Sequence, residues 1–225
     1  MTRGFAPAAV IAAFAILTAG VAATSTIFSP DQVIRNDFGE FGATTVVTRL
    51  IDGAGMSVGF TSGVTDCDTY AAGGPTYGSN NGGGHFFGQR DALAPGVVDF
   101  DFGQTLTIDR IWLFNNPARG ILSLEIYTST VSDFSVSAMV GSFSLGVSNS
   151  ATAMTPLDTL DVVDSSAQCI RFNILSYETV MLGIGEVFAR RRSAASHLGR
   201  LAARGRRAAR RPAPPRAGLS GGGGG

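Results

Sequence analysis

The chain has 225 residues with 17 arginines, 17 acidic residues and no lysine, so its formal net charge is zero. The charges are separated along the chain: every acidic residue lies between Asp31 and Glu186, and ten arginines lie between Arg190 and Arg216. With the two ends set aside, about 165 residues remain, a length that suits one domain with its own core and excludes two domains of ordinary size.

The N-terminus predicts export. Residues 1–24, "MTRGFAPAAVIAAFAILTAGVAAT", have a positive charge at Arg3, an apolar run ending near Leu17 and small residues up to Ala23. This order is typical of a secretory signal peptide, and the apolar run is short for a membrane span of about 20 residues. We expect a secreted or cell-surface domain over residues 25–189 that meets the membrane only through the cleaved signal peptide. The alternative is a retained membrane anchor.

The chain has two cysteines, Cys67 and Cys169. An even number in an oxidising compartment slightly favours a disulfide between them. The alternative is two buried free thiols, and it stays open because a sequence does not give the separation of the two Cα atoms.

Short strand patterns dominate residues 25–189. In "GVVDFDFG", residues 96–103, apolar side chains alternate with Asp99 and Asp101, which is the period of a half-buried strand. Similar runs lie at 107–115, 122–130, 139–146, 168–175 and 183–189. Many short strands separated by turn residues predict an all-β antiparallel sandwich with no helix longer than about three turns.

These pieces, taken in order, resemble the discoidin-like family, also called coagulation factor 5/8 type C or galactose-binding-like domains. "GVVDFDFGQTLTIDRIWLFNNPARGILSLEIYTST" is followed by "GSFSLG" and "AQCIRFNILSYETVMLGIGEVFA", and the upstream "LIDGAGMSVG" is similar to the I-D-G loop of the family. The resemblance covers most of residues 27–189. It implies a jelly-roll β-sandwich that acts as a non-catalytic module, binding carbohydrate, exopolysaccharide or another cell-surface polymer through loops at one end.

The sandwich also predicts which side chains point inward. Alternating residues of both layers make the core of such a fold. Trp112 then falls on the opposite face from its neighbours, either as a sugar-stacking platform or packed under a loop. The expected inward residues are Ile111, Leu113, Ile126, Phe143, Ile170, Phe172 and Val187.

The resemblance further implies a structural calcium ion. Calcium prefers several oxygen ligands, and the positions that match are Asp52, Ser57 and Glu186. A second acidic residue is common in the family two positions after the first, and here that position is Ala54. The alternative is a plain turn at Asp52 with Glu186 facing solvent.

A glycine-rich loop supplies the candidate ligand-binding residues. It combines polar groups with aromatic rings, a mixture suited to sugar recognition, although an inert connection has the same composition. The candidates are Asp66, Asp68, Tyr70, Tyr77, His85, Phe86, Phe87 and Arg90.

A small secreted hydrolase is the alternative function. "GMSVG", residues 55–59, satisfies the G-x-S-x-G pattern of a nucleophile elbow around Ser57. That elbow needs a strand turning into a helix, and "FTSGVTD" after it has no helical pattern. We interpret the match as chance.

Residues 190–225 form an arginine-, glycine- and proline-rich tail that predicts disorder. Nucleic acid is not an expected partner, because an exported protein rarely meets it. Secreted bacterial proteins with such a domain often end in a PEP-CTERM sorting signal of the VPLPA kind. "RSAASHLGRLAAR" shifted by one base can encode a similar Pro-Leu-Pro segment, so we hypothesise a frameshifted sorting signal after about Ala189, which the nucleotide sequence would test.

Overall fold

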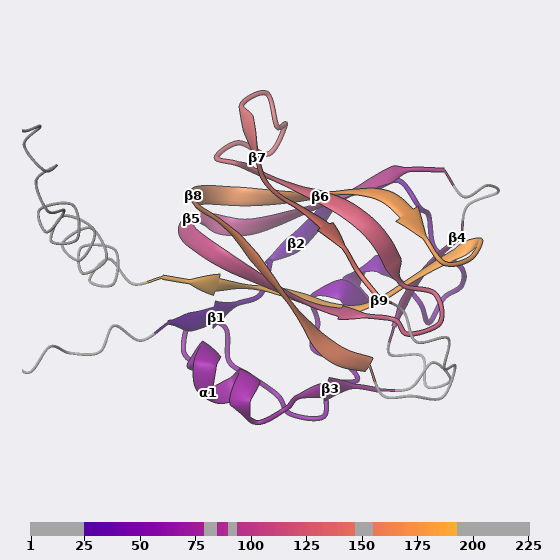
Figure 1. Cartoon of the computed structure of the whole chain (residues 1–225), viewed down its shortest axis with the longest axis horizontal. Coiled ribbons are helices and arrows are strands. Elements are labelled where there is room, and N and C mark those ends of the chain that lie inside the picture. The colour runs from indigo at the N-terminus through magenta and orange to yellow at the C-terminus, as the bar shows by residue number, and fades with distance from the viewer. Residues whose placement is uncertain (1–24, 79–84, 90–93, 147–154, 193–225) are drawn as a thin grey trace, which may run out of the picture.

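The computed structural model of the chain describes residues 25–78, 85–89, 94–146 and 155–192 (Figure 1). The predicted signal peptide, Arg90 and the chain from residue 193 onward lie outside these residues. The described helices are one α-helix and one 3-10 helix, and neither is long and apolar enough to cross a membrane. The elements in chain order are β1 (Thr26–Phe28), β2 (Gln32–Asn36), η1 (Val47–Leu50), α1 (Cys67–Ala72), β3 (Thr76–Tyr77), β4 (Phe86–Gln89), β5 (Gly96–Asn115), β6 (Ile121–Ser129), β7 (Ser137–Ser144), β8 (Thr155–Tyr177) and β9 (Met181–Arg191).

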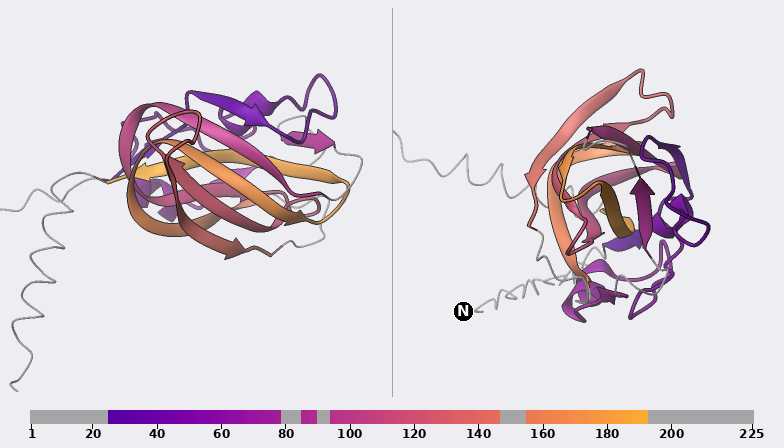
Figure 2. Two further views of the ribbon diagram at one scale, coloured as in Figure 1. Left: turned by 90° about the horizontal axis from the view of Figure 1, so that it is seen from above. Right: turned by 90° about the vertical axis from the view of Figure 1, so that its right-hand side faces the viewer.

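The predicted antiparallel β-sandwich is confirmed. Every strand pair among the described residues is antiparallel, and the main order is β1-β9-β5-β8-β6-β7. The long strands β5 and β8 run through both layers. Near Val98 and Phe172 the two strands pair with each other, and there β5 also pairs with β2 and β8 with β6. At their other ends they again pair with each other, and there β5 also pairs with β9. Seen from the end, the strands enclose the core (Figure 2).

Strand β5 changes layers at a bend. The pairing of β5 with β8 is interrupted between Asp101 and Leu106, and Gly103 within this gap has a φ of 65°. A positive φ favours glycine because it has no side chain to clash with the backbone. The bend therefore allows one continuous strand to serve both layers.

The main core lies between the two layers, as the alternation predicts. Six of the seven expected inward side chains are buried in one apolar cluster, and Phe143 is half-buried against it. Phe143 lies on β7, which is the edge of its layer and has a mostly exposed burial pattern. An edge strand has a neighbour on one side only, so its apolar side chain is covered less completely.

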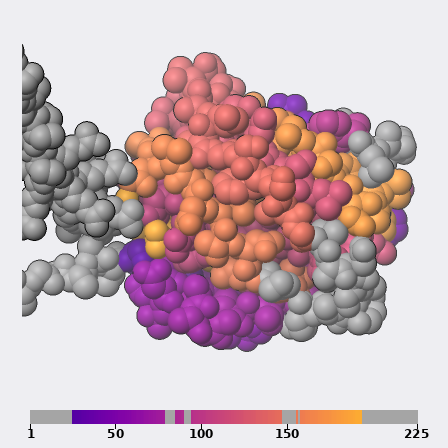
Figure 3. Space-filling view, in the orientation of Figure 1, coloured from indigo at the N-terminus to yellow at the C-terminus, as the bar shows by residue number. Residues whose placement is uncertain are grey.

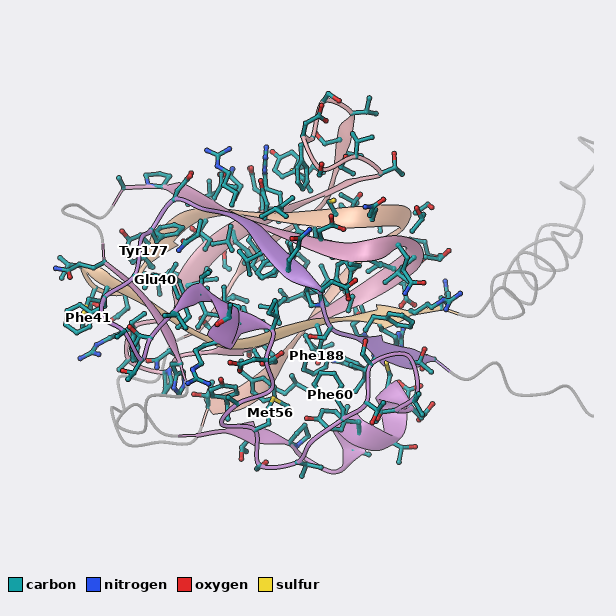
Figure 4. The ribbon with its side chains drawn as sticks, turned by 180° about the vertical axis from the view of Figure 1, so that it is seen from behind. Glu40, Phe41, Met56, Phe60, Tyr177 and Phe188 are labelled. Carbon is teal, nitrogen blue, oxygen red and sulfur yellow. The ribbon has the colours of Figure 1, made fainter. Side chains whose placement is uncertain are left out.

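A second, smaller core lies on the other side of the β9 layer. Trp112, Phe114 and Phe188 point into it, and the chain around α1 covers them. Figure 4 shows Met56 and Phe60 lying against Phe188, and the ring centroids of Phe60 and Phe188 are 5.1 Å apart. The indole of Trp112 donates to Thr159 Oγ1 at 3.0 Å and is 1% exposed. Trp112 is therefore packed under a covering segment and is not a sugar platform.

Strand β9 continues past Ala189, where the sequence places the end of the domain. Arg190 donates through Nε and Nη2 to the two carboxylate oxygens of Asp109, at 2.8 and 2.6 Å. Arg192 is also buried, approaches Asp109 at 3.5 Å and pairs with Asp164. Residues 190–192 therefore belong to the folded domain, because acidic side chains of β5 and β8 hold Arg190 and Arg192 and the backbone of Arg191 pairs with β1 and β5.

Candidate functional site

Most of the predicted ligand-binding residues are buried and do not form a surface. The sugar-recognition role expected for this loop is therefore not supported by the placement of its rings. Tyr70 and Tyr77 pack in the second core and Phe86 in the main core, and the ring of His85 lies 4.8 Å from that of Tyr77. The five buried side chains are Tyr70, Tyr77, His85, Phe86 and Phe87.

The polar residues of the same loop have structural partners. Asp66 caps α1 by accepting from the Thr69 N–H at 2.9 Å, and this bond lowers the pKa of Asp66. Asp68 is exposed and forms an ion pair with Arg190 at 3.3 Å. These contacts anchor the covering segment to the end of β9. Arg90, the remaining candidate, lies outside the described residues.

His85 is a core histidine. Its Nε2 lies 3.2 Å from Thr155 Oγ1, and burial lowers the pKa of His85 to about 4. The ring is therefore neutral near pH 7 and contributes packing and one hydrogen bond.

The predicted disulfide is absent, because Cys67 and Cys169 are both free and buried. Cys67 begins α1 and lies in the second core. Cys169 lies on β8 in register with Asp101 and Ser129, in the other layer. The two thiols thus belong to different parts of the fold.

We expect thiol titration to detect two thiols per chain in denaturant and almost none in the native protein. Burial raises the pKa of Cys67 to about 12 and that of Cys169 to about 11, so little reactive thiolate forms in the folded state. Ellman titration with and without guanidinium measures both values. A denatured count of zero would show that the two cysteines pair.

The metal candidates are brought together only in part. Glu186 is fully buried, and its Oε2 accepts from the Gly53 N–H at 2.8 Å. Burial raises the pKa of Glu186 to about 8, and the negative charge of Asp52 raises it further. The alternative in which Glu186 faces solvent is therefore wrong.

The sequence of β9 explains how a carboxyl group comes to be buried there. The pairing of β5 with β9 shifts between Leu113 and Asn115, opposite the stretch Gly185-Glu186. Such an irregularity turns a side chain toward a new neighbour. Glu186 consequently points with Phe188 toward the segment that carries Asp52 and Gly53.

The other two metal candidates have partners of their own. Asp52 accepts from the Ala54 N–H at 2.8 Å and pairs with Arg49 at 3.0 Å. Ser57 accepts from the Thr76 N–H at 2.9 Å. Residues 53–63 are turns and bends, so Ser57 does not lie on a strand-to-helix elbow.

An unexpected surface lies at the end of the sandwich that carries β4. Phe41 is the one exposed aromatic side chain among the described residues, at 52%. Its N–H donates to the carbonyl of Phe87 at 2.8 Å, which fixes it beside β4. Figure 4 shows Glu40 and Phe41 at this end, away from the start of β1. In the sequence, Phe41 stands in the glycine-flanked stretch "GEFGA", which is not among the predicted site residues.

A guanidinium group lies over the ring of Phe87, whose carbonyl binds Phe41. Arg119 lies on the turn between β5 and β6 with its Cζ 5.3 Å from the ring centroid of Phe87. The Asn116 side chain accepts from the Arg119 N–H at 3.0 Å and so holds the turn. Phe41 and Arg119 thus both contact Phe87, one at its backbone carbonyl and the other at its ring, and we call them the loop-end platform.

Comparison with solved structures shows the fold. One neighbour contains the CBM32-1, CBM32-2 and M60 catalytic domains of ZmpB from Clostridium perfringens, with 13% identity and a TM-score of 0.50 over 73% of this chain and 14% of that chain. Another holds the CBM32-1 and CBM32-2 domains of the same protein in complex with GalNAc, with 11% identity and a TM-score of 0.50 over 72% of this chain and 33% of that chain.

The chain thus spans a third or less of the length of these two neighbours. No family model matches the chain, and no curated protein matches its sequence. The structural likeness nevertheless extends over nearly all of the described residues. The chain has the discoidin-like, galactose-binding-like β-sandwich fold of CBM32 modules.

Proposed function

We propose that this protein is a non-catalytic carbohydrate-binding module that acts outside the cytoplasm. The observation that carries the proposal is the loop-end platform, in which an exposed aromatic residue hydrogen-bonds to the backbone of Phe87 and a guanidinium group lies over the buried Phe87 ring. The fold supports it, since one neighbour of the same fold is a CBM32 pair in complex with GalNAc.

The platform has the chemistry that sugars require. The apolar face of Phe41 can cover the C–H face of a sugar ring, and the N–H groups of Arg119 can donate to its hydroxyls. The backbone of both residues is fixed by hydrogen bonds to Phe87 and Asn116, so little conformational freedom is lost on binding.

Replacing Phe41 by alanine should weaken sugar binding by about tenfold or more, because burying a phenyl ring stabilises a complex by about 1.5–3 kcal/mol. A glycan array that includes GalNAc-terminated, galactose-terminated and chitin-type glycans finds the ligand, and calorimetry measures the loss. Val163→Ala is the control, because Val163 is similarly exposed on β8. Absence of saturable binding to every glycan would refute the function, and unchanged affinity in Phe41→Ala would refute the platform.

We also propose that Glu186 and Asp52 hold a calcium ion. The support is the buried Glu186 Oε1, which has no hydrogen-bond partner in the described structure, beside the Asp52 carboxylate. A cation would satisfy this oxygen and favour the ionised form, and its role would be to tie the loop at Gly53 to β9.

The proposal of export rests on residues 1–24, and the proposed sorting signal on the tail. Because Arg190 and Arg192 both lie near the buried Asp109, we place the hypothesised change of reading frame after Arg192, a few residues beyond Ala189. The acidic partners of these two arginines support the chain up to Arg192 as part of the original domain sequence.

A further inference from the structure

A polar groove lies on the outer face of the other layer, and none of the predicted site residues lines it. It has a volume of about 440 Å³, within the usual range of about 300–1,000 Å³ for ligand sites. Strand β2 forms one wall, β5 and β8 form the floor, and the turn between β6 and β7 forms the other wall. That turn projects from the body of the sandwich (Figure 3).

The floor of the groove is a fixed ion pair. Asp99 lies between core residues of β5 and therefore points outward, yet it is only 2% exposed. Both of its oxygens accept from Arg171, from Nε and Nη2, each at 2.8 Å. A guanidinium group has five N–H donors, so this pairing leaves three for other partners.

The turn that forms the far wall is strained and held in place. Phe134 has a φ of 55°, the only positive value at a non-glycine position in the described chain. Its ring lies under the guanidinium of Arg171, with the Cζ 4.1 Å from the centroid. Asp133 accepts from both the N–H and the hydroxyl of Ser135. Strain of this kind persists where surrounding contacts impose it, and it clusters at ligand sites.

The charges of the groove favour a neutral ligand. Three carboxylates, Asp99, Asp101 and Asp133, face two guanidinium groups, Arg35 and Arg171. The groove therefore carries one net negative charge, which disfavours an anionic polymer. A guanidinium group presents two parallel donors, and a carboxylate presents two acceptors. Each can therefore bind two adjacent hydroxyl groups of a neutral ligand at once.

We propose that this groove is a second carbohydrate site, which holds one residue of a neutral glycan through adjacent hydroxyls. Arg171 and Arg35 donate to the hydroxyl oxygens, and Asp101 and Asp133 accept from the hydroxyl protons. The inference rests on the proposed function but places binding on the sheet face, away from the loop-end platform. Two sites on one module would raise its avidity for a long polymer.

The test uses variants that spare the fixed floor. Removing Arg171 would leave Asp99 buried without its partner, so the variant of choice is Gln32→Ala with Arg35→Ala. Gln32 is exposed, and the half-exposed side chain of Arg35 forms its ion pair with the partly exposed Asp37. Arg110→Ala is the matched control, because Arg110 also pairs with an exposed aspartate but lies outside the groove.

Binding is followed by NMR titration with cellotriose, laminaritriose and galactobiose as neutral probes, glucosamine trimer as a cationic probe and galacturonate trimer as an anionic probe. We expect a neutral probe to shift amide signals at Gly103 and Ser132 as well as at Phe41. The double variant should lose at least about tenfold in affinity at the groove alone, since it removes the charged hydrogen-bond donor Arg35 and the neighbouring amide of Gln32 from the wall.

The outcomes separate the two proposals. If neutral probes bind only at Phe41 and the double variant behaves as Arg110→Ala does, the groove proposal is overturned and the function stands. If only a charged probe binds in the groove, the ligand class is overturned. Groove binding that persists in Phe41→Ala supports the second site, whereas no binding of any probe or array glycan overturns the function itself.

Discussion

Replacing Arg190 by methionine should lower the free energy of unfolding by about 3–5 kcal/mol, whereas the same change at Arg191 should cost less than about 1 kcal/mol. The side chains of Arg190 and Asp109 are only 12% and 6% exposed, so Arg190→Met leaves a buried carboxylate without its bidentate partner. Arg191 is exposed and only approaches the ring of Phe28, at 5.4 Å. Urea unfolding followed by tryptophan fluorescence measures both changes.

A pair of truncations provides an independent control. A chain that ends at Arg192 keeps Arg190 and Arg192 with their aspartates, and it should unfold at the same urea concentration as the full chain. A chain that ends at Ala189 should unfold at a lower concentration. Equal stability of all three chains would restore the domain boundary to Ala189.

Without calcium, the domain should lose stability as the pH rises from about 4.5 to about 8, by up to about 4 kcal/mol from Glu186 alone. The pKa of Glu186 is about 8 in the folded protein against an ordinary value of 4.5. The folded state therefore binds more protons than the unfolded state between these values. The stabilisation is complete below the lower pKa and is lost as the pH passes through the upper one.

The effect of Glu186 on stability is best measured between about pH 6.5 and 8. His85 acts in the opposite sense at lower pH, because burial lowers its pKa to about 4 from 6.5. Within this window Glu186 contributes a fall of about 2 kcal/mol, which Glu186→Gln should abolish. A slope that survives in Glu186→Gln would show that another group titrates.

Calcium should abolish this fall of stability with rising pH. An ion bound to the folded state alone stabilises it by about 2.7 kcal/mol at a hundred times its dissociation constant, and it keeps Glu186 ionised. Melting temperatures with calcium and with a chelator measure this effect. Identical values would leave Glu186 as a buried neutral acid and refute the proposed ion.

The fold could be predicted because its signals are local. Val98, Phe100 and Phe102 alternate along one strand, and the structure buries all three. The aromatic loop carries no such period, so its composition fits a surface site and a covering segment equally well. Tyr70 and Tyr77 are buried only because β5 and β9 present Trp112 and Phe188 on their second face.

Long-range partners explain the remaining differences between the sequence-based predictions and the structure. Nothing near Arg190 in sequence indicates Asp109, which lies 81 residues earlier, so the arginine run reads as a tail. Phe41 is exposed because its backbone is tied to Phe87 while no described segment covers its ring. The groove likewise depends on the register of β2, β5 and β8. In this register Arg35 lies opposite Asp99 on the neighbouring strand, and Asp99 lies opposite Arg171.

The place of β9 also sets the time at which the domain can fold. A ribosome makes the chain from its N-terminus, so β9 is the last strand of the sandwich to be made. Until then β1, β4 and β5 lack the strand that they all pair with, and both apolar clusters lack one wall. A nascent chain therefore presents open strand edges and apolar surface, which chaperones bind and which promote aggregation. The domain therefore cannot complete its fold before β9 has left the ribosome. Until then the chain stays unfolded enough to pass through a narrow channel.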